Sequence, residues 1–236
     1  MTEPLFARDA YLKDCEATIT AVHDNGVELD RTVFYAQGGG QPGDTGTLTP
    51  AGGAALTVTN AVKGETPGSI VHLLAEGATP PAVGTKVTAA IDWDRRHKLM
   101  RMHTCMHLLS AVLPYPVTGG SVGDEKGRLD FDIPEATLDK DEIGAKLAAL
   151  IAADHPVSEE WITDAELDAQ PDLVKTMSVQ PPRGAGKVRL LRIGDNVDLQ
   201  PCGGTHVKRT GEIGAVEIGK IEKKGRQNRR VNIRFV

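Results

Sequence analysis

Two short motifs, far apart in the sequence, combine residue types that bind metal ions. His103 and His107 lie four residues apart in a run of helix-forming residues, while Cys202 and His206 lie four apart around a Gly-Gly pair. Residues four apart on a helix leave the same face, so both imidazoles can reach one ion. The glycines of the second motif allow backbone angles that let the Cys202 thiolate and the His206 imidazole converge on one point.

Three imidazoles and one thiolate are a ligand set that suits zinc, a borderline-soft ion that accepts nitrogen and sulfur ligands in a tetrahedral arrangement. Either motif alone has a simpler interpretation, as ordinary helix or turn residues. Their occurrence together favours a metal site. The sequence therefore predicts one Zn²⁺ ion bound by His103, His107, Cys202 and His206.

The residues between the two helical histidines indicate which reactions a metal site here would not catalyse. Thr104, Cys105 and Met106 do not include the glutamate that serves as general base in the HExxH metalloproteases, so proteolysis is not expected. Cys105 lies about 200° around the helix from His103 and is predicted to pack inward rather than to bind metal.

Composition places the chain among globular proteins. Of its 236 residues, 40% are hydrophobic and 25% are charged, and no run of 18 apolar residues could cross a membrane. The N-terminus lacks the basic-then-apolar order of a secretory signal, and three scattered cysteines make no disulfide framework. We expect a monomer in the reducing cytoplasm, without a membrane partner.

Charge is distributed unevenly along the chain. Residues 187–236 hold 12 Lys and Arg against 5 Asp and Glu, a net charge of +7, although the whole chain carries −5. Such a basic segment is either a solvated hairpin or a surface that contacts phosphate groups of a nucleic acid. We predict phosphate contacts, because the segment follows a metal motif, and assign them to Lys223, Lys224, Arg226, Arg229 and Arg230.

Residues 1–90 show the pattern of a small all-β domain. Short apolar runs alternate with turn clusters such as Asp24-Asn25-Gly26 and Thr66-Pro67-Gly68. Expected strands include Ala17–Val22, Gly26–Leu29 and Leu56–Asn60. We predict a β-barrel-like or sandwich domain.

Residues 91–236 mix helices and strands and are predicted to form an α+β domain. Asp92 is a candidate N-cap for a helix from Trp93 to Val112, which Pro114 and Pro116 would end. Further helices are expected at Leu138–Ala153 and, as two short pieces broken at Pro171, over Asp164–Met177. Strands are expected at Arg128–Ile133, Val157–Ile162, Lys187–Ile193, Asn196–Leu199, Gly214–Lys220 and Arg229–Val236.

A glycine-rich segment in the first domain resists a purely structural interpretation. Five of the nine residues from Gly38 to Gly46 are glycine, which lets the backbone approach another chain closely and exposes N–H donors. The segment lacks the Gly-Lys-Ser/Thr ending of a phosphate-binding P-loop. A simple β-turn is the alternative.

These motifs together resemble the AlaX family, free-standing relatives of the editing domain of alanyl-tRNA synthetase. The resemblance rests on Phe34-Tyr35 through Gly46, His103-Thr104 through Leu109, Arg128-Leu129-Asp130-Phe131, and Cys202-Gly203-Gly204-Thr205-His206-Val207, in the family's order. The length resembles that of the medium-sized AlaX class. The editing domain of threonyl-tRNA synthetase has a similar ligand pattern but lacks the segment from Phe34 to Gly46.

The resemblance implies an N-terminal β-barrel-like domain (residues 1–90), an α+β editing domain with zinc (residues 91–236), and hydrolysis of the aminoacyl ester of tRNA(Ala) mischarged with serine or glycine. Zinc would activate or orient a water molecule near the ester at the acceptor end. Four protein ligands normally make a closed site, so a tRNA-binding module with purely structural zinc is the competing hypothesis.

The residues implied in substrate binding come from the glycine-rich segment and from a second glycine pair, which stands where the synthetase-embedded domain has a Gln-Lys-Gly-Ser type of segment. They are Gly38, Gly39, Gly40, Gln41, Asp44, Thr45, Gly120 and Ser121. No general base is identified, and Asp130 is the one candidate side chain for catalysis. Four histidines outside the motifs are expected at the surface or at caps: His23, His72, His97 and His155.

Overall fold

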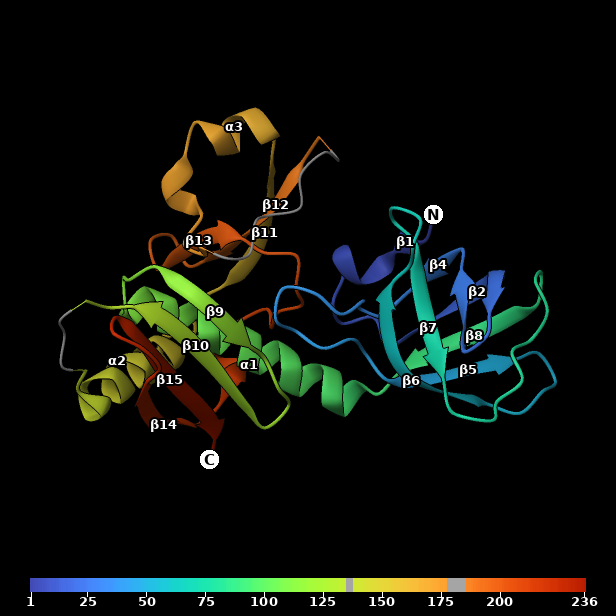
Figure 1. Cartoon of the computed structure of the whole chain (residues 1–236), viewed down its shortest axis with the longest axis horizontal. Helices are drawn as coiled ribbons and strands as arrows, with labels where there is room; N and C mark the ends of the chain where they lie inside the picture. Colours follow the sequence, from blue (N-terminus) through green and yellow to red (C-terminus); the bar gives the residue numbers. More distant parts are fainter. Residues whose placement is uncertain (135–137, 178–185) are drawn as a thin grey trace. The chain divides into compact units, whose positions relative to one another are not determined.

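The computed structural model of the chain describes residues 1–134, 138–177 and 186–236. It divides into two compact units, Met1–His97 and Lys98–Val236 (Figure 1). The first unit is all β apart from short turns, and the second combines helices with two sheets, so the predicted α+β class with an N-terminal barrel is confirmed. Among the described residues, no helix has both the length and the apolar character needed to cross a bilayer.

Six antiparallel strands of the first unit close into a barrel, in the order β2-β3-β7-β6-β5-β8. The strands are β2 (Asp14–His23), β3 (Gly26–Leu29), β5 (Gly46–Pro50), β6 (Leu56–Lys63), β7 (Ile70–Leu74) and β8 (Lys86–Ile91). Two short strands, β1 (Glu3–Pro4) and β4 (Arg31–Thr32), pair in parallel, and Leu5–Ala7 forms a 3-10 turn. The closed barrel leaves none of its six strands with an open edge.

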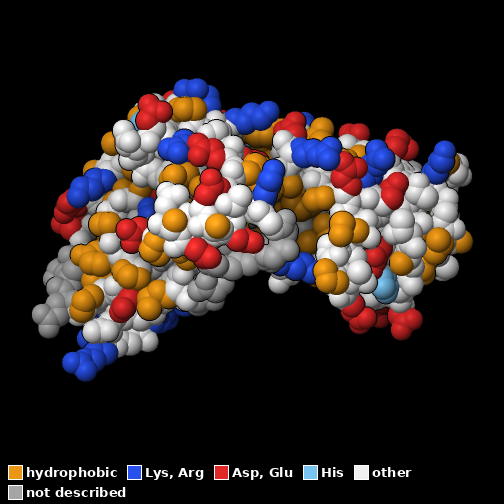
Figure 2. Space-filling model, turned by 90° about the horizontal axis from the view of Figure 1, so that it is seen from above, with side chains coloured by type: hydrophobic (Ala, Val, Ile, Leu, Met, Phe, Trp, Pro, Cys, Tyr) orange, Lys and Arg blue, Asp and Glu red, His pale blue; other side chains and the backbone are white. Residues whose placement is uncertain are grey.

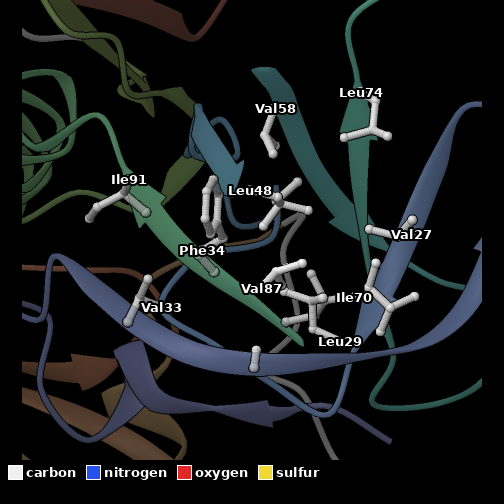
Figure 3. Close-up of a cluster of buried hydrophobic side chains, with 14 of the residues drawn as sticks. Val27, Leu29, Val33, Phe34, Leu48, Val58, Ile70, Leu74, Val87 and Ile91 are labelled. Atoms are coloured by element: carbon white, nitrogen blue, oxygen red, sulfur yellow. The ribbon is translucent and has the colours of Figure 1, made fainter. Parts of the chain in front are cut away.

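The barrel encloses an apolar core of side chains that alternate along its strands. Val27, Leu29, Leu48 and Val58 are fully buried, and Phe34 packs among them from the segment after β4 (Figure 3). This inward alternation is the period of two that a half-buried strand requires.

The second unit contains a four-stranded antiparallel sheet in the order β14-β15-β10-β9, covered on one face by two helices (Figure 1). Its elements are α1 (Trp93–Val112), β9 (Val117–Ser121), β10 (Lys126–Asp132), α2 (Lys140–Ala152), β14 (Val216–Lys223) and β15 (Asn228–Phe235). Gly127 on β10 lies against the thioethers of Met102 and Met106, so that helix α1 and the sheet pack closely there.

A second, three-stranded antiparallel sheet has the order β11-β12-β13. It consists of β11 (Val157–Ile162), β12 (Val188–Ile193) and β13 (Asp198–Pro201), with helix α3 (Asp164–Asp168) after β11. Pro171–Leu173 and Thr210–Ile213 form 3-10 turns. Strand β13 ends directly before Cys202 and thereby sets the position of the second metal motif.

Local signals in the sequence locate most of these elements. Helix α1 has the predicted bounds, and the Asp92 carboxylate accepts a hydrogen bond from the Arg95 N–H at 3.1 Å. The expected second helix after Pro171 is wrong, because these residues form only a 3-10 turn. The strand expected at Asn196–Leu199 begins two residues later, and β9 was not predicted at all.

His72 corrects the prediction that it lies at the surface or at a cap. Its side chain is fully buried in the barrel unit, where Nδ1 lies 3.2 Å from the Val27 carbonyl and Nε2 lies 2.8 Å from Thr32 Oγ1. Since a carbonyl only accepts, Nδ1 carries the proton and Nε2 accepts from the Thr32 hydroxyl. Burial lowers the pKa of His72 to about 4, from an ordinary value of 6.5.

We predict that acid destabilises the barrel unit through His72. Because the pKa is depressed in the folded state, the stability is fully present above pH 6.5 and is lost as the pH falls from 6.5 towards 4, by up to about 3 kcal/mol. Urea unfolding followed by Trp93 fluorescence, in a Trp161→Phe background, reports on this unit, because Trp93 is then the single tryptophan and packs against the barrel core.

The matched variants are His72→Gln, which removes the buried imidazole, and His23→Gln, which removes an exposed one. The first should flatten the loss of stability between pH 6.5 and pH 4 and the second should retain it. An unchanged pH dependence in His72→Gln would contradict the assignment.

Candidate metal centre

The two predicted motifs meet in the second unit. Helix α1 presents His103 and His107 from one face, and the turn after β13 presents Cys202 and His206; the four ligand atoms all lie within 4.8 Å of one another. Cys202 Sγ is 3.2 Å from His206 Nε2 and 3.7 Å from His103 Nε2. A tetrahedral ion with bonds of about 2.0–2.3 Å separates its ligand atoms by about 3.3–3.8 Å. The two sulfur–nitrogen distances are close to this range, and ligand atoms that lie up to 4.8 Å apart would draw together around a small metal ion.

The pKa values of the cluster reflect a thiolate surrounded by imidazoles. Burial raises the pKa of the Cys202 thiol, but the neighbouring imidazoles outweigh it and hold this pKa well below its ordinary value. Burial lowers the pKa of His206 to about 3, so its ring is neutral. Burial also lowers the pKa of His107, yet the Cys202 thiolate and a hydrogen bond to the Asp198 carboxylate outweigh it and raise that pKa to about 9. An ion binding here would displace the His107 proton.

Thr104 fixes the orientation and the tautomer of His206. Its hydroxyl lies 3.0 Å from the Met100 carbonyl, to which it donates. The oxygen therefore accepts from His206 Nδ1–H at 3.2 Å and from the Val207 N–H at 3.3 Å. With Nδ1 protonated, the Nε2 lone pair of His206 is free for an ion.

Asp198 fixes the orientation and the tautomer of His107. The carboxylate is buried, and Oδ2 accepts from His107 Nδ1–H at 3.0 Å and from Gln200 Nε2 at 2.7 Å. Lys175 Nζ lies 2.6 Å from the other oxygen. Burial raises the pKa of Asp198, but His107 and Lys175 outweigh it, so the carboxyl is ionised. Asp198 was not predicted as a site residue from the sequence. The signal that could have identified it is an acidic residue in a strand that ends just before the Cys202 motif.

Arg189 holds the backbone of the Cys-His turn. Its NH1 group donates to the carbonyls of Cys202 at 3.0 Å and Gly204 at 2.7 Å, and its NH2 group pairs with Glu159. The Cys202 N–H in turn donates to the Arg189 carbonyl at 3.1 Å. The spacing of the motifs does not indicate this contact, because Arg189 lies outside both motifs and reaches the turn only in the folded protein.

Cys105 packs inward, as predicted. Its side chain is fully buried, and burial raises the pKa of its thiol to about 12. A thiol in this state is a poor metal ligand, because the thiolate is the form that binds. The two cysteines near the site therefore differ in charge and in exposure, since Cys105 is buried and Cys202 is partly exposed.

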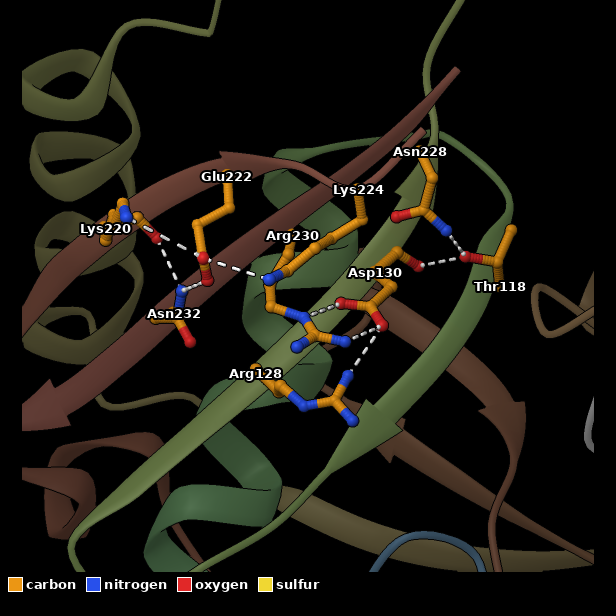
Figure 4. Close-up of polar contacts among 9 residues, drawn as sticks. All are labelled: Thr118, Arg128, Asp130, Lys220, Glu222, Lys224, Asn228, Arg230 and Asn232. Carbon is orange, nitrogen blue, oxygen red and sulfur yellow. Dashed lines mark hydrogen bonds and ion pairs between the residues drawn. The ribbon is translucent and has the colours of Figure 1, made fainter. Parts of the chain in front are cut away.

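Asp130 lies on the face of the four-stranded sheet opposite the helices, between two guanidinium groups (Figure 4). Its carboxylate accepts from Arg230 Nε at 2.7 Å, Arg230 NH2 at 2.9 Å and Arg128 NH1 at 2.6 Å. Burial raises its pKa, but the two arginines outweigh this and lower it. Asp130 is thus ionised and engaged by cations, and its part in catalysis stays a prediction.

The glycine-rich segment is an ordered loop of the barrel unit. Gly38 and Gln41 exchange two backbone hydrogen bonds, of 3.1 and 2.9 Å, across a tight turn in which Gly39 and Gly40 have φ of 57° and 82°. Such values favour glycine. Gln41 is buried, and the Tyr35 hydroxyl donates to the Gly38 carbonyl at 2.8 Å.

Asp44 anchors this loop. Its buried carboxylate accepts from Arg96 Nε at 2.9 Å and from the Tyr35 N–H, and Arg96 also donates to the carbonyls of Ala10 and Val33. The neighbouring Thr45 carbonyl accepts from the Asp92 N–H at 2.7 Å. Both carboxylate oxygens are engaged within the protein, so Asp44 shapes the loop, and substrate contacts by the loop stay a prediction.

The second predicted substrate segment lies on β9, an edge strand. A Cβ atom at Gly120 would stand 3.0 Å from the Leu129 side chain, so this residue packs tightly over β10. Ser121 is exposed and pairs in register with Arg128. The Thr118 hydroxyl donates to the Asp130 carbonyl at 3.1 Å and accepts from Asn228 at 2.9 Å.

The five predicted basic residues lie on the β14–β15 hairpin but differ in their surroundings. Lys223, Lys224 and Arg226 are exposed, whereas Arg230 pairs with Asp130 and Arg229 donates to backbone carbonyls of the hairpin turn. Among the described contacts, Lys223 and Arg226 form no ion pair, and Lys224 pairs with Glu222. On the face shown in Figure 2, basic and acidic side chains are interspersed.

Comparison with known proteins relates parts of both units to tRNA synthetases. Residues 188–232 match the threonyl and alanyl tRNA synthetase second additional domain, and residues 9–95 match the class II (A) tRNA synthetases. The chain is 37% identical to the alanyl-tRNA editing protein AlaX-M of Methanosarcina mazei, over 98% of this chain and 95% of that protein. AlaX-M of Saccharolobus solfataricus is 34% identical, over 98% of each chain. Alanine–tRNA ligase of Pyrobaculum aerophilum is 37% identical over 94% of this chain, which covers 25% of the ligase.

The contacts of Thr104 generate a prediction about metal affinity. Replacing Thr104 by Val leaves the Nδ1–H of His206 and the N–H of Val207 without their acceptor in a buried position, which costs about 1–3 kcal/mol of stability. We expect Zn²⁺ affinity to fall at least about tenfold, as for other groups that orient metal-bound histidines. Competition with a chromophoric chelator measures this affinity. Thr104→Ser keeps the hydroxyl and should stay close to wild type; equal affinities of the Val and Ser variants would contradict the role of the hydroxyl.

Proposed function

The chain belongs to the family of the alanyl-tRNA editing proteins AlaX-M, and we propose from this that it deacylates mischarged tRNA(Ala) by hydrolysing the aminoacyl ester. The observation that carries the proposal is similarity over nearly the whole chain, to relatives of nearly the same length, together with a four-ligand cluster from both predicted motifs. The reaction class is that of an aminoacyl-tRNA hydrolase that needs no ATP.

We propose that the cofactor is one zinc ion, held by His103, His107, Cys202 and His206. When bound, zinc would supply a Lewis acid for the ester carbonyl or for a water molecule. Three of the ligands are buried, while Cys202 is partly exposed, so solvent reaches the cluster on the Cys202 side. Substrate is therefore expected to approach from that side of the cluster.

The proposed substrates carry serine or glycine on the ribose hydroxyl of the tRNA acceptor end. A synthetase pocket shaped for alanine cannot exclude the smaller glycine by size, and one added hydroxyl in serine is rejected only about 10²-fold. A separate hydrolytic site corrects such errors. The glycine-rich loop from Gly38 to Thr45 and the β9 residues Gly120 and Ser121 are proposed to contact this substrate.

The two parts of the chain are proposed to have different roles, with residues 1–90 carrying the glycine-rich loop and residues 91–236 carrying the zinc. We propose that the protein acts as a monomer in the cytoplasm and binds tRNA(Ala) through exposed cations of the β14–β15 hairpin.

A tRNA-binding module with structural zinc is the second candidate, and the presence of four protein ligands favours it, because catalytic zinc sites usually have three. A threonyl-type editing domain is a weaker alternative. The names of these relatives refer to alanyl-tRNA or alanine, and the matched region at residues 9–95 includes the segment that the threonyl type lacks.

The decisive experiment incubates the protein with Ser-tRNA(Ala), Gly-tRNA(Ala) and Ala-tRNA(Ala). We expect faster loss of serine or glycine than of alanine. His103→Ala and Cys202→Ala should reduce deacylation by at least about 10²-fold, because each removes a ligand of the proposed ion. Equal stability of all three substrates with and without protein would refute editing, and binding of tRNA without hydrolysis would support the binding module.

A second prediction concerns tRNA binding by the hairpin. Lys223→Gln with Arg226→Gln should weaken binding to tRNA and reduce the slope of log K against log salt by up to about 2, since each cation neutralises at most one phosphate. Lys146→Gln on α2 is the control, because it removes an exposed cation elsewhere in the same unit. Arg230 is unsuitable for this test, as its replacement also releases Asp130. An unchanged salt slope in the double variant would place the tRNA surface elsewhere.

A further inference from the structure

A lysine is connected to the metal centre through a buried carboxylate. Lys175 Nζ lies 2.6 Å from Asp198 Oδ1, and Asp198 Oδ2 accepts from His107 Nδ1–H at 3.0 Å. The Asp198 side chain is 0% exposed, whereas Lys175 is 31% exposed. The three residues come from three separate segments: α1, the chain after the 3-10 turn Pro171–Leu173, and β13.

Lys175 and Asp198 each have a further contact outside this arrangement. The Lys175 backbone is tied to the start of β9, because the Val117 N–H donates to the Lys175 carbonyl at 2.9 Å. Gln200 Nε2 donates both to Asp198 Oδ2, at 2.7 Å, and to the Ser110 hydroxyl, at 3.0 Å. Such cross-links fix the carboxylate between the lysine and the histidine.

One buried carboxylate is thus shared by two donors, the Lys175 ammonium on one oxygen and the His107 Nδ1–H on the other. A carboxylate that receives the Nδ1–H of a ligand histidine orients the ring and increases the basicity of its Nε2. A cation on the opposite oxygen reduces the field that the carboxylate exerts on the histidine.

We propose that Asp198 is the positioning residue of the metal centre and that Lys175 is its counter-cation, which limits how tightly the site holds its ion. This inference rests on the proposal that the four ligands bind a metal. The positive charge of Lys175 offsets the negative charge of the ionised Asp198 carboxylate. The attraction between this carboxylate and the ion is thereby weakened. The ion remains electron-poor, which suits a Lewis acid.

The two residues consequently have opposite effects on affinity. Asp198→Asn removes the charge that orients His107, and Zn²⁺ affinity falls by about 10–100-fold. Lys175→Met leaves Asp198 with the His107 Nδ1–H and Gln200 as its remaining partners. Affinity then rises, by roughly threefold or more, because no cation offsets the attraction between the Asp198 carboxylate and the divalent ion. The metal-free protein becomes less stable in the same variant, since a buried charge has lost a partner.

A double-mutant cycle tests whether Lys175 affects metal affinity through Asp198 or independently of it. If Lys175 acts through Asp198, Lys175→Met raises affinity in the wild-type background and has little effect in the Asp198→Asn background. Lys175→Arg restores a cation and should return the affinity to that of wild type. Lys146→Met is the matched control, because Lys146 also pairs with a carboxylate, at 2.6 Å from Glu142, but on the exposed surface of α2.

The experiment strips the full-length protein with a chelator and measures Zn²⁺ affinity by competition with a chromophoric chelator. The visible spectrum of the Co²⁺-loaded protein reports whether the tetrahedral ligand set is retained, and urea unfolding in EDTA reports the stability of the metal-free form. None of these readouts needs tRNA, so a failure of the editing assay leaves them interpretable.

The expected result is a loss of affinity and an altered Co²⁺ spectrum in Asp198→Asn, a gain of affinity with an unaltered spectrum in Lys175→Met, and no change in Lys146→Met. Wild-type affinity in Asp198→Asn, or equal gains from Lys175→Met in both backgrounds, would overturn the inference. Absence of Zn²⁺ binding by the wild-type protein would overturn the proposed metal site as well.

Discussion

The metal centre of the second unit depends on one negative charge, the thiolate of Cys202, whose side chain is partly exposed. A thiolate that is largely removed from water is costly unless positive charge or hydrogen-bond donors surround it. Here three imidazoles converge on the sulfur, from helix α1 and from the turn that carries Cys202 itself. The same electrostatic requirement that brings the imidazoles to the thiolate also creates a place for a cation with nitrogen and sulfur ligands.

Both units use a buried charge to hold a loop in one conformation. In the second unit, Arg189 fixes the turn from Cys202 to His206 by donating to two of its carbonyls. In the barrel unit, Arg96 binds Asp44 and two further carbonyls, and thereby fixes the glycine-rich loop. Removing one partner of the buried Arg96–Asp44 pair costs about 3–5 kcal/mol, because the other charge is left uncompensated. Loops that have few apolar contacts of their own are made rigid in this way.

The sequence predicts what depends on neighbouring residues and misses what depends on distant ones. Helix α1 and its cap at Asp92 follow from local signals, and the four ligands follow from spacing within two motifs. Asp198, Lys175 and Arg189 were missed, because their importance arises only when β12 and β13 meet α1. His72 was misplaced for a related reason: its partners Thr32 and Val27 lie at least 40 residues away in the sequence, so nothing nearby marks it as buried.

The wide separation of the ligands also constrains the order in which the protein can form during synthesis. His103 and His107 leave the ribosome with α1, but Cys202 follows 95 residues after His107. Strand β10 must likewise wait for β15, its partner from Asn228 to Phe235. At roughly 5–20 residues per second, the histidines exist for several seconds before their remaining ligands. The barrel unit, whose strands all precede residue 92, can meanwhile be complete. The nascent chain is therefore expected to carry a folded first unit and an open, metal-free second one until its last residues emerge.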